Sequence, residues 1–201
     1  MRSRHQSAAG GMRFRRRVYP GLSPACTGRP NRRSSIPLPK SAAASPAVPL
    51  PFSKVYPEIG WAIMRTSWDE EAPLLAVKSG YRWNQTHADA STFILYQKGS
   101  PLIVDSGTCN YSRPEYTDYC RQSQAHNALF LNGEGQPTNQ IGIRAKFRGP
   151  ILKWFDALGV QYIRTDATGP KANLFTQHYS HFLWIGKPIV IFDACHHVRG
   201  Q

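Results

Sequence analysis

The chain has 201 residues, enough for one domain with a sizeable core, and its formal net charge of +13 suggests a nucleic-acid partner. The distribution of charge argues against that partner, because residues 1–50 hold ten of the 25 Lys and Arg residues and no Asp or Glu. Residues 51–201 hold the other fifteen basic residues and all twelve acidic ones, so this part of the chain is nearly neutral. We therefore expect it not to bind nucleic acid. No run of about 18 apolar residues exists, so we also expect no membrane span.

Residues 1–51 predict a disordered tail, because they are rich in Pro, Ser, Ala and Arg and lack apolar periodicity. An Arg- and Ser-rich, acid-free tail fits an organelle transit peptide, and a start site assigned too far upstream explains it equally well. We therefore leave the tail out of the fold and place one domain at 52–201. This N-terminus indicates no localisation.

The rest of the chain reads as short strands separated by Gly- and Pro-containing turns. The segment 91–107, "STFILYQKGSPLIVDSG", predicts a hairpin with a loop at "QKGSP", and no window from residue 60 onward predicts an amphipathic helix. The predicted strands lie in 60–68, 73–80, 91–107, 126–136, 142–149, 151–155, 159–165, 175–185 and 187–193. This pattern predicts an all-β fold, an antiparallel β-sandwich. Because the last apolar run ends close to the C-terminus, we expect the sandwich to be truncated there.

The four cysteines form no CxxC pair, which argues against both a disulfide framework and a four-cysteine zinc site. Cys26 lies in the tail and Cys195 near the C-terminus. Cys109 and Cys120 could pair across a loop, but two separate thiols are the simpler interpretation.

Three polar residues mark the ends of predicted strands: His87, Asp105 and His126. Strand ends can converge at one edge of an antiparallel sandwich, and two imidazoles with one carboxylate form a zinc first shell with a fourth position left open. The alternative is that each residue is a turn former or a solvated cap. The adjacent His196 and His197 point to opposite faces of a strand, so one site cannot use both.

Two longer stretches carry a family resemblance. "THADASTFILYQKGSPLIVDSGTCNY", followed by "RQSQAHNALFLNGEGQ", resembles the C-terminal β domain of the heparinase II/III-like polysaccharide lyases. The resemblance implies an α/α-toroid domain before the sandwich, with the substrate cleft between them, and nothing in residues 1–50 resembles that toroid. It also implies that His87, Asp105 and His126 bind one Zn²⁺ ion, mainly for structure.

The family's reaction is β-elimination on a uronic acid of an acidic polysaccharide, such as a heparin-like, heparan-like or alginate-like chain. Polar donors neutralise the uronate carboxylate, and a Tyr or His moves the C5 proton. Asn84 matches the carboxylate-neutralising Asn of the family's pattern. Gln85 stands where a catalytic His is usual, and an amide cannot act as an acid or a base.

The same resemblance assigns contacts with the glycan to the region after Asp105. Tyr111 and Tyr116 lie where family members place a substrate-facing, catalytic Tyr, although either ring could instead pack on the sheet. Arg121 and Asn127 are the candidate substrate-binding residues, and a solvated loop charge is the alternative for Arg121.

The leading hypothesis is therefore the sandwich domain of a polysaccharide lyase that is inactive without its toroid domain. The alternative is a non-catalytic carbohydrate-binding sandwich derived from a lyase, which Gln85 favours. The resemblance implies a periplasmic or cell-envelope location.

Overall fold

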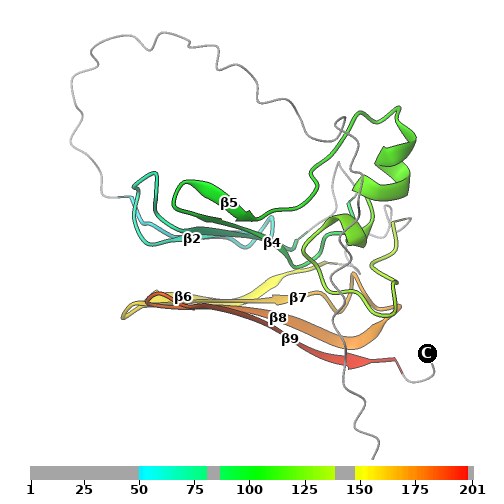
Figure 1. Cartoon of the computed structure of the whole chain (residues 1–201). Coiled ribbons are helices and arrows are strands. Elements are labelled where there is room, and N and C mark those ends of the chain that lie inside the picture. Colours follow the sequence, from blue (N-terminus) through cyan, green and yellow to red (C-terminus); the bar gives the residue numbers. More distant parts are fainter. Residues whose placement is uncertain (1–49, 81–86, 139–147, 199–201) are drawn as a thin grey trace, which may run out of the picture.

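The computed structural model describes residues 50–80, 87–138 and 148–198. Two antiparallel sheets lie one above the other, and short helical turns gather at one end of the stack (Figure 1). The first sheet has the order β1-β2-β3-β4-β5 and the second the order β6-β7-β8-β9. The strands are β1 Lys54–Tyr56, β2 Trp61–Arg65, β3 Leu74–Lys78, β4 Thr92–Gln97, β5 Ser100–Ile103, β6 Ile151–Ala157, β7 Val160–Asp166, β8 Phe175–Ile185 and β9 Ile189–His197. The predicted all-β sandwich is confirmed.

Alternation of apolar residues builds the core between the two sheets. In β8, every second residue from His178 to Trp184 is buried, as expected for a strand with one face against a core. The ring of Phe182 meets Phe93 of β4 edge to face at 5.8 Å. The buried core consists of Ala62, Met64, Leu75, Val77, Leu95, Ile151, Ile163, Phe182 and Trp184. Each large side chain of this kind stabilises the fold by roughly 1.5–3 kcal/mol.

The predicted hairpin at 91–107 is present as β4 and β5. Its two-residue loop consists of Lys98 and Gly99, with φ angles of 52° and 68°. Two positive φ angles are typical of a type I′ turn, whose twist matches that of the paired strands. The hairpin therefore follows from its turn residues as much as from its apolar runs.

The prediction of a strand at 126–136 is wrong. This segment contributes only the isolated bridge between Leu131 and Glu134, around a turn at Asn132 and Gly133, where both φ angles are positive. One of its carbonyl groups, at Leu129, accepts a hydrogen bond from the side chain of Lys171 instead of from a strand (2.8 Å). Of the predicted strand at 142–149, residues 142–147 lie outside the described residues.

No amphipathic helix is present among the described residues, in line with the sequence, but two short helical turns are. A π-helical turn, η1 (Tyr116–Cys120), and a 3-10 turn, η2 (Ser123–Ala125), lie between β5 and β6. Both are too short to carry an amphipathic repeat, so the sequence pattern could not reveal them. They form the green coils at one end of the sandwich (Figure 1).

The two sheets are also joined by polar contacts near that end. The hydroxyl of Ser91 lies 3.3 Å from that of Ser79 and 2.7 Å from that of Thr165 in the opposite sheet, and all three residues are buried. Beside them, Gly80 and Gly149 form a backbone bridge. These contacts hold the start of β4 against β7.

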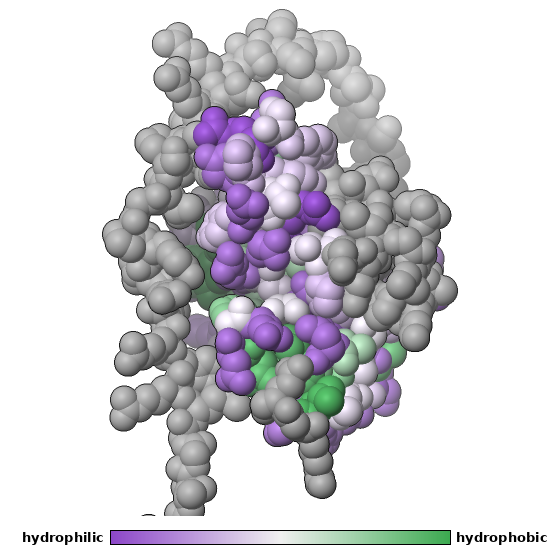
Figure 2. Space-filling model, turned by 90° about the vertical axis from the view of Figure 1, so that its right-hand side faces the viewer, coloured by the Kyte–Doolittle hydropathy of each residue, from purple (hydrophilic) through white to green (hydrophobic). Residues whose placement is uncertain are grey.

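Within the described ranges, no helix is long and apolar enough to cross a membrane. The end of the molecule that carries η1 and η2 presents mainly hydrophilic residues, with hydrophobic residues gathered toward its lower part (Figure 2).

Candidate metal centre and adjoining loop

A turn immediately before β4 carries His87 and Asp89. Its backbone is held from several sides: Ala88 N–H donates to the carbonyl of Arg121 (2.7 Å), and Ser123 Oγ donates to the carbonyl of Ala88 (2.7 Å). The segment around η1 and η2 therefore fixes the turn, so side chains distant in sequence meet at this point.

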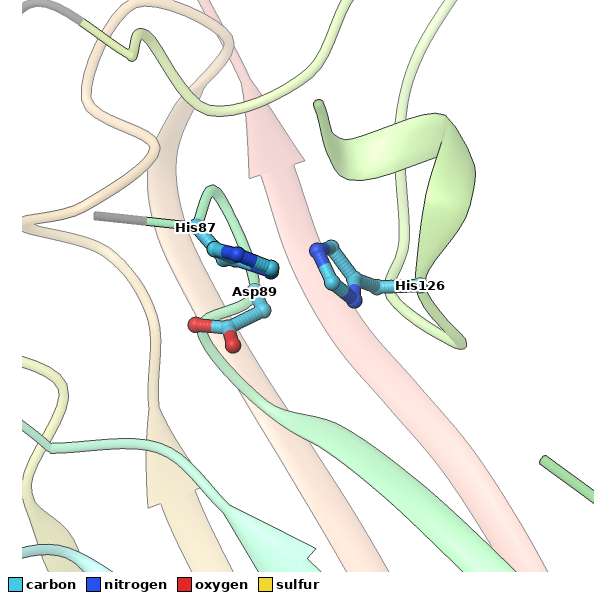
Figure 3. Close-up of side chains that lie close together, drawn as sticks. All are labelled: His87, Asp89 and His126. Carbon is cyan, nitrogen blue, oxygen red and sulfur yellow. The ribbon is translucent and has the colours of Figure 1, made fainter. Parts of the chain in front are cut away.

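Three buried side chains converge there: His87 and Asp89 from the turn and His126 from the end of η2 (Figure 3). One ligand atom from each lies within 4.8 Å of the others, and the centroids of the two imidazole rings are 5.1 Å apart. Two nitrogens and one carboxylate at this spacing could surround a single metal ion.

Unpartnered nitrogen atoms support a metal at this position. Nε2 of His87 and Nε2 of His126 are both buried, and neither has a hydrogen-bond partner among the described residues. A buried polar atom without a partner costs roughly 1–3 kcal/mol, so a bound ion that accepts both lone pairs would remove that cost. The donor set, two imidazoles with carboxylates nearby, fits Zn²⁺.

Asp105 reaches His126 from the other side of the imidazole. Its Oδ2 lies 3.2 Å from His126 Nδ1. With the proton on Nδ1, His126 donates to this carboxylate and directs the lone pair of Nε2 toward the centre. The structure thus brings together His87, Asp105 and His126. Whether Asp105 ligates a metal directly or orients His126 stays a prediction.

The protonation states suit metal binding at neutral pH. Burial, followed by the nearby His126, lowers the pKa of His87 below its usual value, so the imidazole is neutral. The hydrogen bond with His126, and a second one from the Gly107 backbone N–H, lower the pKa of Asp105, so the carboxylate is ionised. Both are the forms that a cation binds.

Asp89 was missed from the sequence. It forms an ion pair with Lys78 Nζ, and its side chain is only 10% exposed. The His-x-Asp spacing with His87 was a usable signal, because a turn can direct residues i and i+2 to the same side.

A tyrosine-rich loop borders this centre. The ring of Tyr116 in η1 meets His87 edge to face at 6.0 Å, and Tyr111 meets Tyr116 in the same way at 4.7 Å. Tyr111 is 59% exposed, whereas Tyr116 is half-buried. Tyr111 is therefore the more accessible of the two to a ligand.

The predicted substrate-binding residues have structural contacts. The guanidinium of Arg121 lies 5.7 Å from the Tyr116 ring and donates to the carbonyl of Thr138 (3.2 Å). Asn127 Nδ2 donates to the carbonyl of Phe93 in β4 (2.9 Å). Both side chains therefore hold the loop in place, and their roles toward a glycan stay predictions.

Asn84 and Gln85, the predicted catalytic residues before the turn, lie outside the described residues.

Residues 49–174, more than half of the chain, match the family model of the heparinase II/III-like, C-terminal domain. The chain belongs to this family. Among curated proteins, this heparinase II/III-like chain is 32% identical over 94 residues to a heparin-sulfate lyase from Bacteroides stercoris. That alignment covers 44% of the chain and 14% of the relative.

Solved structures support the same fold. A heparinase III gene product superposes with a TM-score of 0.63 at 24% identity, and a heparan sulfate lyase mutant from Pedobacter heparinus with 0.62 at 20%. Each match covers 75% of this heparinase II/III-like chain and 23% of the other. The chain thus spans less than a quarter of the relatives it matches.

Proposed function

We propose that this heparinase II/III-like domain is the sandwich part of a polysaccharide lyase that cleaves heparan-type glycans by β-elimination. The observation that carries the proposal is the buried cluster of His87, Asp89 and His126, with Asp105 beside His126, next to the exposed Tyr111. Relatives described as heparin-sulfate and heparan sulfate lyases support a heparan-type substrate over an alginate-type one.

We further propose that the cluster holds one structural Zn²⁺ ion. Nε2 of His87 and Nε2 of His126 would ligate it, with a carboxylate from Asp89 or Asp105. Bound there, the ion supplies positive charge that ties the turn before β4 to the segment after η2. With Asp89 as the carboxylate, the side chains need little rearrangement, because their ligand atoms already lie close together.

In β-elimination, the proton at C5 of the uronate must leave while the neighbouring carboxylate stays neutralised. Asn84 would donate hydrogen bonds to that carboxylate. Tyr111 would contact the sugar and exchange a proton with it, because its ring is exposed, while Tyr116 packs on His87 and supports the loop. The toroid expected from the family would provide the other proton-transfer groups.

Metal analysis of the purified chain tests the zinc proposal. We expect about one zinc per chain, loss of zinc in His87→Ala, and a lower thermal unfolding temperature in that variant. A zinc-free protein whose stability is unaffected by His87→Ala would overturn the assignment.

A lyase assay tests the reaction. The chain would be fused behind the part of the Bacteroides stercoris relative that precedes the matched segment, and given heparan sulfate or alginate. A conjugated 4,5-unsaturated uronate absorbs at about 232 nm, so absorbance should rise with heparan sulfate, and the rise should be much smaller in a Tyr111→Phe fusion. A rise with alginate alone would contradict the substrate class.

A non-catalytic carbohydrate-binding role is the second candidate, and Gln85 favours it because an amide cannot transfer a proton. The same fusion carrying Gln85→His discriminates between the two functions. Elimination activity already present with Gln85 would support the lyase. Activity gained only with Gln85→His would support a decayed lyase, and glycan binding without any activity in either fusion would support a binding module.

A further inference from the structure

Two cysteine side chains face each other within the loop that borders the candidate metal centre. Sγ of Cys120 in η1 lies 3.4 Å from Sγ of Cys109, which is four residues beyond Asp105. Cys120 is fully buried and Cys109 is half-buried. Cys195, in contrast, lies exposed on β9.

The approach needed for a bond between them is small. A disulfide has a sulfur–sulfur distance of about 2.05 Å, so the two atoms must come roughly 1.4 Å closer. Residues 104–110 belong to no helix or strand, so the Cys109 side of the loop can move without breaking a ladder. Cys120 is held by η1 and by burial.

We propose that Cys109 and Cys120 form an intrachain disulfide when the protein meets a disulfide oxidant. The Cys109 thiolate, the more accessible, attacks the oxidant disulfide and releases one thiol. The Cys120 thiolate then attacks the Cys109 sulfur of the mixed disulfide and releases the second thiol. In sum, two cysteine thiols lose two protons and two electrons, and one oxidant disulfide becomes two thiols.

The cross-link closes a ring around the tyrosine loop. Tyr111 and Tyr116 both lie between the bonded cysteines, and Tyr116 contacts His87. The ring also joins the segment that follows Asp105 to the segment that precedes His126. Oxidation therefore restrains the side chains beside the centre, whether or not the chain binds zinc or cleaves a glycan.

Peptide mapping of the full chain tests the proposal. The protein is equilibrated in a mixture of oxidised and reduced glutathione, alkylated, denatured without reductant and cleaved after Glu residues. Because Glu115 lies inside the ring, cleavage should yield fragments 72–115 and 116–134 joined by a disulfide. Two of the four cysteine thiols should be lost, and reductant should separate the fragments.

Matched variants separate this pair from other thiols. Cys109→Ser, at a half-buried position, should abolish the joined fragments, whereas Cys195→Ser should leave them unchanged. Hydrogen exchange of the fragment 116–134 should slow on oxidation in the native chain but not in Cys109→Ser. Fragments that stay separate in the oxidised native chain, or that join to the peptides of Cys26 or Cys195, would overturn the proposal.

Discussion

His126 uses its two ring nitrogens for different tasks. Nδ1 faces Asp105, while Nε2 is buried toward His87 without a hydrogen-bond partner in the described part of the chain. A carboxylate behind a ligating imidazole fixes its tautomer and raises its basicity. We therefore expect the carboxylate of Asp105 to support the proposed zinc site whether or not it is a direct ligand.

Asp105→Asn tests this arrangement. The amide keeps the shape but loses the charge, so we expect zinc affinity to fall by about 10- to 100-fold, as is usual for such supporting partners. Competition with a zinc indicator measures the change. Asp156→Asn, on exposed β6, is the control and should leave the affinity unchanged. Complete loss of zinc in Asp105→Asn would instead make Asp105 a direct ligand.

The buried amine of Lys171 should give the protein's stability an unusual pH dependence. Burial lowers its pKa to about 8 in the folded protein, while the unfolded chain titrates near 10.5. Between these values the unfolded state binds more protons, so the free energy of unfolding rises with pH through this window, by about 3 kcal/mol in all. Below about pH 8, the full cost of burying the charged Lys171 amine destabilises the folded state.

Urea unfolding at several pH values between 7 and 10.5 measures this effect. Lys171→Met should flatten the rise, although it leaves the carbonyl of Leu129 without its donor. Lys153→Met, on the exposed face of β6, should follow the wild-type curve. An unchanged slope in Lys171→Met would contradict the assignment to this lysine.

At this scale the sequence singled out His87, Asp105 and His126, and the structure places both other residues near His126, although His126 follows η2 and opens no strand. Asp89 was missed because its side chain comes from a turn, whose direction depends on contacts with η1 and η2. Those contacts are long-range, so the local His-x-Asp spacing alone did not establish that Asp89 lies close to His126.

Among the elements, strands with a strict alternation were predictable, and β8 is the clearest case. The run at 126–136 misled because apolar residues indicate burial but not a hydrogen-bonded partner. Its Asn-Gly turn at 132–133 brings Leu131 and Glu134 together, and no neighbouring strand pairs with it among the described residues.

Glycine is required at two positions where the start of β2 lies beside the end of β3. Gly60 and Gly80 have φ angles of 69° and 66°, and a Cβ on Gly80 would lie 2.1 Å from the carbonyl oxygen of Ile59. Because this oxygen belongs to the backbone, no side-chain rotation can relieve the clash. Gly80 N–H also donates to the carbonyl of Gly149 (2.6 Å).

Gly80→Ala should therefore lower the free energy of unfolding by about 4 kcal/mol or more. Gly159→Ala is a matched control, because its φ of 75° is similar but a Cβ there meets nothing within 4 Å. In the control variant, only the backbone strain of a non-glycine residue at positive φ should lower the free energy of unfolding, by roughly 1–2 kcal/mol. Chemical denaturation measures both, and equal losses would contradict a steric cause.

For the whole molecule, the assignment of strands to two sheets could not be read from the sequence. The order along the chain predicts neighbours within a sheet, since successive antiparallel strands pair through short loops. The chain passes from the first sheet to the second in the long segment 104–150, between β5 and β6. In this segment the sequence predicted a strand at 126–136 that does not form.

The charge distribution makes a prediction for the intact chain. Because residues 1–50 hold ten basic and no acidic residues, we expect them to dominate retention on immobilised heparin at low salt. Deleting residues 1–48 should lower the salt needed for elution and leave zinc content unchanged. Unchanged retention would place the polyanion-binding charge in the sandwich. The truncated chain is thus the proper background for glycan-binding assays.

The hydroxyl contacts among Ser79, Ser91 and Thr165 have a consequence for anyone who would engineer this centre. They seat the turn bearing His87 against a strand of the opposite sheet. A hairpin of β4 and β5 grafted onto another scaffold together with the turn before it would lose both this support and His126, which follows η2. The smallest transferable unit is therefore a two-layer block, and random mutagenesis aimed at metal affinity should include β7.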